Sequence, residues 1–354
     1  ALSREFIKNS WRIAPVPVRR GFGTVRFSAS FQPPAAHPSH LSPVAFVPPL
    51  FRFLSCDKIL KAEETGKTET HVQRRRIPVE NFKAGIVQMN SGPDVEENMR
   101  AVREYTAYAA AEGAKFIMFP ETVDYIGTQM GKHAERIPGY VTRTFAGLAR
   151  RHGVYIHCGS ITEAAPGGRP FNTTLLFAPD GQIRALYRKL HLFDVELENG
   201  PSFRESDEIA PGSEIVVAEP HFASLGLSIC YDIRFPELYR MQVQSGAEVL
   251  CVAANFTRET GEKHWETLLR ARAVENTSYV LAAGQCGMKR AFEAYGHSMI
   301  IDPLGEIVAE AGEEPEVLIA ELDRERLENA RMSLPCLTGR RQDVYQISGR
   351  IQKY

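Results

Sequence analysis

Short apolar runs alternate with longer segments of mixed polarity from residue 82 onward. Short apolar runs are typical of buried strands, and longer amphipathic segments are typical of helices. The predicted strands cover residues 82–88, 115–119, 153–161, 172–178, 182–187, 224–230, 248–254, 278–284, 296–301, 306–310 and 316–321. The predicted helices cover residues 95–112, 141–151, 236–245, 262–276 and 323–332. This mixture predicts layered α/β packing with both hairpins and crossover connections.

Capping and turn residues support several of these boundaries. Asp94 precedes the first predicted helix as an N-cap, and Glu97 stands three residues later, as in a capping box. The turn Pro179-Asp180-Gly181 separates two predicted strands and indicates a hairpin. Pro236 suits the first turn of a helix that follows strand 224–230.

Residues 1–56 differ from the rest of the chain in composition. They hold seven Lys or Arg residues and one acid, which gives a net charge of +6, together with eight prolines and many serines. A basic, Ser-rich and acid-poor segment is typical of an organelle transit peptide, and a disordered tail without that role has the same composition. Residues 57–81 are interpreted as a linker. Both a cytoplasmic and a mitochondrial location therefore stay open.

The composition of the whole chain argues against several classes of protein. A net charge of −1 gives no electrostatic case for binding nucleic acid or a membrane surface, and no apolar run is long enough to span a bilayer. The six cysteines lack close Cys-x-x-Cys spacing, and His-Glu-x-x-His is absent. We therefore expect neither a metal nor another cofactor.

Three short segments at predicted strand ends carry Glu121, Lys189 and Cys230. A thiol becomes a strong nucleophile when a base removes its proton, and a carboxylate can take that proton and later give it to a departing amine. A fixed cation and a backbone N–H can stabilise the negative charge that develops during the attack. The residues predict Cys230 as the nucleophile and Glu121 as the general base and acid. Lys189 and the Tyr231 N–H are the predicted stabilisers of the charge.

With their flanking residues, these segments resemble the nitrilase (carbon–nitrogen hydrolase) superfamily, whose Glu–Lys–Cys triad occurs in the same chain order. The matching motifs are Phe119-Pro120-Glu121, Arg188-Lys189-Leu190-His191 and Cys230-Tyr231-Asp232. Further stretches match the Nit branch at residues 87–90, 264–265, 270–273, 295–298 and 340–345. The resemblance implies a four-layer α-β-β-α sandwich over residues 82–335. It also implies a homodimer in which the tail, residues 336–354, contacts the partner subunit.

The resemblance implies a fourth catalytic residue as well. The family has a second glutamate that assists the reaction, and Phe203-Arg204-Glu205-Ser206 resembles its setting, so Glu205 is the candidate. From the residues alone, Glu205 is a charge in a polar loop. Phe256 and Thr257 follow strand 248–254, and their place at a strand end makes them candidate substrate-binding residues together with Tyr231.

Two other interpretations stay open. His191, His264 and His297 lie in the matched motifs and offer a Cys–His pair as a second mechanism. A catalytically silent dimeric scaffold is the alternative to an enzyme. A lowered pKa at Cys230 would favour the enzyme, because such a thiol is alkylated faster than an ordinary one.

The expected substrate is a small amide that carries a carboxylate. Residues 282–287 and 295–298 look most like the Nit branch that hydrolyses deaminated glutathione, while the sister branch of ω-amidases, which act on α-ketoglutaramate, shares most motifs. A nitrile is a further alternative. The insertion between Cys286 and Tyr295, with Met288, Lys289, Arg290 and Glu293, is expected to face the entrance, where its basic residues suit an anionic substrate.

Overall fold

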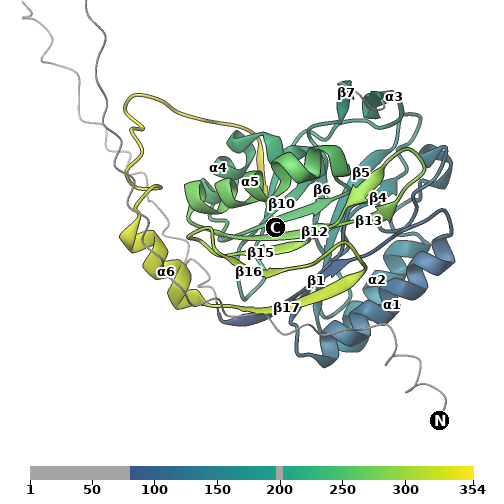
Figure 1. The fold of residues 1–354 in the computed structure, drawn as a ribbon, viewed down its shortest axis with the longest axis horizontal. Coiled ribbons are helices and arrows are strands. Elements are labelled where there is room, and N and C mark those ends of the chain that lie inside the picture. Colours follow the sequence, from purple (N-terminus) through teal and green to yellow (C-terminus); the bar gives the residue numbers. More distant parts are fainter. Residues whose placement is uncertain (1–79, 197–201) are drawn as a thin grey trace, which may run out of the picture. The chain divides into compact units, whose positions relative to one another are not determined.

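The computed structural model describes residues 80–196 and 202–354 (Figure 1). The predicted transit-peptide-like extension, residues 1–56, lies outside the described residues, as does nearly all of the predicted linker, residues 57–81. Among the helices of the described ranges, none is both long enough and apolar enough to cross a membrane.

Two mixed sheets form the centre of the described part, and each has seven strands there. The first runs in the order β17, β1, β2, β3, β5 and β4, with β6 also paired to β5. Its strands are β1 (Phe82–Gln88), β2 (Phe116–Met118), β3 (Tyr155–His157), β4 (Ile161–Glu163), β5 (Phe171–Phe177), β6 (Ile183–Arg188) and β17 (Glu316–Leu322). The hairpin predicted at Pro179-Asp180-Gly181 joins β5 to β6 and is confirmed.

The second sheet runs in the order β16, β15, β12, β11, β10, β9 and β18. Its strands are β9 (Ile215–Ala218), β10 (Leu225–Ile229), β11 (Val249–Ala254), β12 (Tyr279–Gly284), β15 (Met299–Ile301), β16 (Ile307–Glu310) and β18 (Ile351–Lys353). Strands β10, β11 and β12 are parallel neighbours, so their carboxyl ends lie at the same edge of the sheet.

Helices cover the outer faces of both sheets, as Figure 1 shows. The helices α1 (Val95–Ala111) and α2 (Tyr140–His152) pack on the first sheet, and α4 (Pro236–Gln244) and α5 (Arg258–Asn276) pack on the second. A further helix, α6 (Arg324–Ser333), follows β17. The predicted four-layer α-β-β-α sandwich is therefore confirmed. Asp94 caps α1 as predicted, since its side chain accepts the Glu97 N–H at 3.0 Å.

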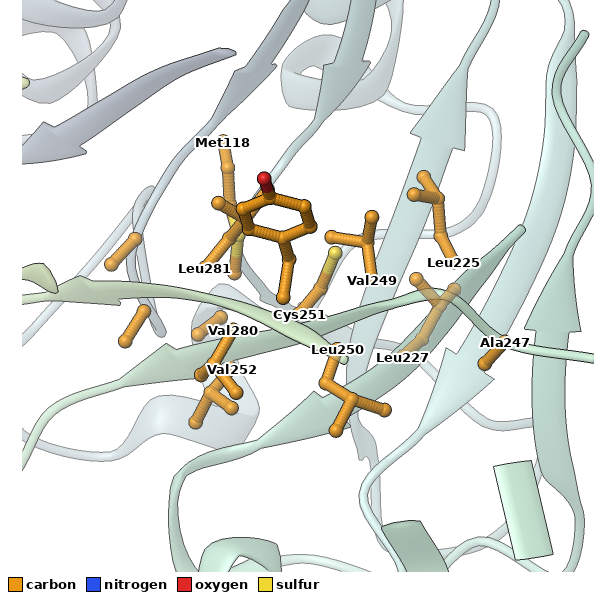
Figure 2. Close-up of a cluster of buried hydrophobic side chains, with 14 of the residues drawn as sticks. Met118, Leu225, Leu227, Ala247, Val249, Leu250, Cys251, Val252, Val280 and Leu281 are labelled. Carbon is orange, nitrogen blue, oxygen red and sulfur yellow. The ribbon is translucent and has the colours of Figure 1, made fainter. Parts of the chain in front are cut away.

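The main core lies between the two sheets and continues beneath α4 and α5. Alternate residues of β11 point to opposite faces, as the pleat of a strand requires. Figure 2 shows Val249 and Cys251 on the side of Met118, which comes from β2 of the facing sheet, and Leu250 and Val252 on the other side. Apolar side chains on both faces explain why this strand reads as a continuous apolar run.

The single strand predicted over residues 153–161 is wrong, because the backbone breaks between β3 and β4. Gly159 lies in the break with a φ of +73°, and a Cβ atom at this position would collide with the carbonyl oxygen of Pro120. Ser160 then accepts the Thr122 N–H with its side-chain oxygen at 2.9 Å. The break therefore packs against the two residues that flank Glu121.

Several elements were not predicted or begin elsewhere. Helix α5 starts at Arg258 rather than residue 262, and Gly261 inside it leaves room for the ring of Tyr295. Strands β9 and β18 were missed, as were two short hairpins near the site. These hairpins are β7 (Asp194–Glu196) with β8 (Ser202–Arg204), and β13 (Cys286–Met288) with β14 (Glu293–Tyr295).

The end of the predicted tail adds a strand to its own chain. Residues Ile351–Lys353 form β18 and pair in parallel with β9, so that Ile351 lies opposite Ile215. Contact between residues 336–354 and a partner subunit stays a prediction.

Candidate active site

Glu121 lies just past the end of β2, where contacts with two other loops hold its backbone. Its carbonyl oxygen accepts the side-chain amide of Gln285 at 2.9 Å, and the N–H of Thr122 is bound by Ser160. The Glu121 carboxylate is buried and accepts the Asn255 N–H at 2.8 Å. A strand-end loop that is fixed in this way holds the carboxylate in one place.

Lys189 follows β6 directly and is fully buried apart from 2% of its side chain. Its Nζ lies 3.0 Å from Glu121 Oε1 and 2.8 Å from Glu205 Oε2. A buried ammonium is stable only when charges of opposite sign and hydrogen bonds replace its hydration shell. The two carboxylates supply both.

Glu205 opens the short helix α3 (Glu205–Glu208), immediately after β8. Besides binding Lys189, its Oε2 accepts the Phe193 N–H at 2.7 Å. The residue that resembles a solvated loop charge in the sequence therefore lies in the same cluster as Glu121 and Lys189.

Cys230 directly follows β10 and begins the 3-10 helix η3 (Cys230–Arg234) with a φ of +48°. Positive φ is strained for a residue with a side chain, so surrounding bonds must hold this corner. The buried Asp232 does so, because its carboxylate accepts the Ile229 N–H at 2.9 Å and the Tyr187 hydroxyl at 2.6 Å. The corner resembles a nucleophile elbow in placing the side chain at a sharp strand-to-helix turn.

The four side chains line one pocket with a volume of about 340 Å³. Tyr231, Phe256 and Thr257, the predicted substrate-binding residues, line it too. Part of the wall is aromatic and was not predicted: Phe193, Phe203 and Phe292 come from the two short hairpin regions. The pocket lining also includes Asn172, Asn255 and Arg204, which were likewise missed.

The signals for these missed residues are weak in the sequence. Asn255 follows the end of β11, directly before Phe256, so the strand-end argument that selected Phe256 applies equally to Asn255. Asn172 lies at the amino end of β5, whereas the predicted site residues follow the carboxyl ends of strands. The hydrogen bond from the Lys189 N–H to its backbone oxygen brings Asn172 to the site.

Comparison with known proteins agrees with this geometry. The family described as Carbon-nitrogen hydrolase matches residues 83–332. The chain is 41% identical to a deaminated glutathione amidase of Synechocystis over 73% of this chain and 98% of that protein. It is 36% identical to the omega-amidase NIT2 of Danio rerio over 75% of this chain and 97% of that protein.

The chain belongs to the carbon–nitrogen hydrolase family. Its fold matches the crystal structure of Nit3 from Saccharomyces cerevisiae, a member of branch 10 of the nitrilase superfamily, with a TM-score of 0.69 and 30% identity. That match covers 75% of this chain and 98% of the other. The resemblance to the Nit branch that the sequence indicated is confirmed.

Burial and neighbouring charges shift the pKa values of Cys230 and Lys189 in the hydrolase site. Burial and the neighbouring charge of Glu121 raise the pKa of the Cys230 thiol well above its ordinary value, although Lys189 acts in the opposite direction. Burial alone would lower the pKa of Lys189, but Glu121 and Glu205 outweigh it and hold this pKa well above normal. The surroundings of Cys230 therefore raise its pKa and do not lower it, in contrast to the thiol that rapid alkylation would indicate.

The three candidate histidines have partners other than the Cys230 thiol. His191 Nδ1 lies 2.7 Å from Asp232, and its ring stacks on Phe235. His264 contacts Arg234, and His297 lies 3.1 Å from Glu310. This arrangement favours a carboxylate over an imidazole as the base.

Lys289 does not face the pocket entrance as predicted. Its side chain is buried under the β13–β14 hairpin, where Nζ lies 2.6 Å from Asn90 Oδ1 and 3.3 Å from Gln285 Oε1. These oxygens and the Ser91 carbonyl oxygen, which also accepts from Nζ, are neutral. Burial therefore lowers the pKa of Lys289 to about 8, against a smaller opposing effect of Cys286. Glu293 is paired with Arg258 instead of lying free at the entrance.

No group of three or more His, Cys, Asp or Glu side chains in the described ranges is arranged to hold a metal ion.

Lys289 generates a pH-dependent prediction. Its pKa is lower in the folded chain than the ordinary 10.5, so the unfolded chain binds more protons between about pH 8 and 10.5. The contribution of Lys289 to the free energy of unfolding therefore increases as the pH rises through this window. Compared with Lys289→Met, the unmodified chain should gain about 2–3 kcal/mol of unfolding free energy between pH 7 and pH 10.

Urea unfolding at several pH values measures this difference. The matched control is Lys115→Met, which changes an exposed lysine, and its difference from the unmodified chain should stay constant. A constant difference for Lys289→Met as well would show that Lys289 is not a neutral amine in the folded chain at high pH.

Proposed function

We propose that this hydrolase is an amidase that converts a small carboxylate-bearing amide into a carboxylic acid and ammonia. Deaminated glutathione is the first candidate substrate, and α-ketoglutaramate is the second. This chain matches a deaminated glutathione amidase and an omega-amidase over nearly the whole length of each relative. The observation that carries the proposal is the buried cluster of Glu121, Lys189 and Glu205 in one pocket with Cys230.

In the first half of the reaction, Cys230 attacks the amide carbon. The Glu121 carboxylate takes the thiol proton as the sulfur–carbon bond forms, which fits a thiol whose raised pKa keeps it neutral until then. Lys189 and the Tyr231 N–H stabilise the negative oxygen of the tetrahedral intermediate. Glu121 then gives its proton to the nitrogen, the carbon–nitrogen bond breaks, and ammonia leaves a thioester on Cys230.

In the second half, water hydrolyses the thioester. Glu121 takes a proton from the water as its oxygen attacks the thioester carbon, and the same Lys189 and Tyr231 groups hold the oxyanion. The carbon–sulfur bond breaks, the acid leaves, and Cys230 regains its proton from Glu121. Glu205 assists by holding Lys189, whose Nζ it binds at 2.8 Å.

The remaining lining residues bind the substrate. Phe256 and Thr257 follow β11 beside the nucleophile and contact the part of the substrate next to the amide. Arg204 is a lining cation besides Lys189, and its side chain is 63% exposed with Glu196 only at 3.6 Å. A guanidinium in this state is available to bind a carboxylate. Arg204 therefore takes the role that the sequence assigned to the β13–β14 insertion.

Ammonia release tests the function directly. The chain is incubated in parallel with deaminated glutathione, α-ketoglutaramate and a neutral nitrile, and Cys230→Ala is the control. We expect turnover of one of the two amides and at least a thousandfold loss in Cys230→Ala, because the nucleophile is gone. Turnover of the nitrile alone would favour a nitrilase. Inactivity of the unmodified chain with all three would favour the scaffold, and near-normal activity of Cys230→Ala would refute the mechanism.

Arg204→Gln tests recognition of the carboxylate. We expect KM for the acidic amide to rise about twofold to fivefold with little change in kcat, because an ion pair at an exposed site contributes about 0.5–1 kcal/mol to binding. KM for a neutral amide of similar size should not change. The matched control is Arg100→Gln on α1, an arginine that is 65% exposed and also paired with a glutamate. An equal effect on both substrates would contradict this role of Arg204.

A homodimer belongs to the same proposal. Apolar side chains near the end of the chain, among them Met332, Val344 and Tyr345, are exposed in the single chain and suit burial against a partner. Light scattering at micromolar concentration should give twice the chain mass of 39.5 kDa. A mass of one chain would contradict the dimer.

A mitochondrial location stays a proposal from the composition of residues 1–56. Fluorescent fusions with and without these residues test it, and identical cytoplasmic distributions would contradict it.

A further inference from the structure

Asn172 occupies the centre of the site beside the two glutamates. It is the second residue of β5, and its backbone oxygen accepts the Lys189 N–H at 2.9 Å. Only 5% of Asn172 is exposed. This pairing places Asn172 and Lys189 next to each other across adjacent chain segments, so both side chains reach the same carboxylates.

The Asn172 amide group bridges these carboxylates. Nδ2 lies 2.9 Å from Glu121 Oε1 and 3.4 Å from Glu205 Oε1. An ionised carboxylate only accepts hydrogen bonds, so the NH₂ end of the amide must face the glutamates. Lys189 Nζ binds the same two oxygens, each at 3.0 Å. Each of these oxygens is therefore held by one cationic donor and one neutral donor.

The balance of charge explains why a neutral donor is useful here. Two carboxylates share one ammonium, so the cluster carries an excess of negative charge when both are ionised. A second cation would remove that excess but would also make Glu121 a weaker base. An amide supplies hydrogen bonds to both carboxylates and adds no charge. Glu121 is then fixed in position and can still take and return a proton.

We propose that Asn172 is a positioning residue that holds Glu121 and Glu205 around Lys189 and keeps Glu121 available as a base. This inference rests on the proposed amidase function and adds to it a residue outside the Glu–Lys–Cys–Glu set. The other oxygen of the Glu121 carboxylate, Oε2, accepts the Asn255 N–H, so each carboxylate oxygen is held by one asparagine.

Asn172→Leu tests the proposal because leucine has a similar volume and no donor. We expect kcat to fall about tenfold to a hundredfold with KM changed less than threefold, since a hydrogen bond to a charged group is lost. The acid limb of the kcat/KM profile should move to higher pH, because the ionised form of the base loses a donor.

Asn172→Asp provides a second variant of the same shape. An ionised aspartate adds a third negative charge and removes the donor, while a protonated aspartate restores an O–H donor. Its activity should therefore recover as the pH falls, opposite to Asn172→Leu. Thr174→Val is the matched control, since Thr174 lies two residues further along the same strand and binds His157 instead. That variant should lower Tm without moving the pH profile.

The rate at which iodoacetamide alkylates Cys230 gives a readout that needs no turnover. Removal of the thiol proton depends on Glu121 in our proposal, so Asn172→Leu should slow alkylation at neutral pH and shift its pH dependence. If the unmodified chain hydrolyses no amide, the amidase proposal fails, while the alkylation rates still decide the role of Asn172. Unchanged alkylation and an unchanged pH profile in Asn172→Leu, with only Tm lowered, would overturn the inference.

Discussion

The buried ammonium of Lys189 is the constraint on which the rest of the site depends. Removing this charge from water is costly, and two carboxylates with good geometry offset the cost. Glu121 comes from the end of β2, Lys189 from the end of β6, and Glu205 from α3. These three elements meet only when the first sheet and the β7–β8 region are both formed. The charged cluster therefore exists only in the folded chain.

The second sheet carries Cys230, the proposed nucleophile, and the first sheet carries Glu121 and Lys189 of the charged cluster. The apolar core between the sheets, to which Met118 of β2 and Cys251 of β11 both contribute, fixes the distance from β10 to β2 and β6 (Figure 2). This packing sets the position of Cys230 relative to Glu121. The Cys230 thiol is buried beside the Glu121 carboxylate, and both effects raise its pKa. In the proposed mechanism, the thiol therefore loses its proton only during attack on a substrate. A thiol with a lowered pKa would instead be ionised before substrate binds.

The sequence predicts the elements whose signals are local and misses those whose causes are distant. The Asp94 cap, the turn at Pro179-Asp180-Gly181 and the apolar run of β11 each depend on neighbouring residues, and all three are confirmed. The break at Gly159 depends on Pro120, nearly forty residues away in the chain, so no local pattern reports it. Lys289 illustrates the same limit. A basic residue in a polar insertion resembles an entrance residue, and distant oxygens of Asn90, Ser91 and Gln285 hold its side chain inside the fold.

Gln285 connects that inward lysine to the proposed base. Its Nε2 donates to the Glu121 carbonyl and to Ser91 Oγ, and its Oε1 accepts from the Ser91 N–H and from Lys289. A buried amide with every group satisfied is rigid, because moving any partner leaves another unpaired. The β13–β14 hairpin starts next to Gln285, and the chain between its strands supplies Phe292 to the pocket wall. The same residue, Gln285, therefore holds both the hairpin that forms part of the pocket wall and the backbone of Glu121, the proposed base. A change that displaces this hairpin must act on the position of Glu121 as well as on the shape of the pocket.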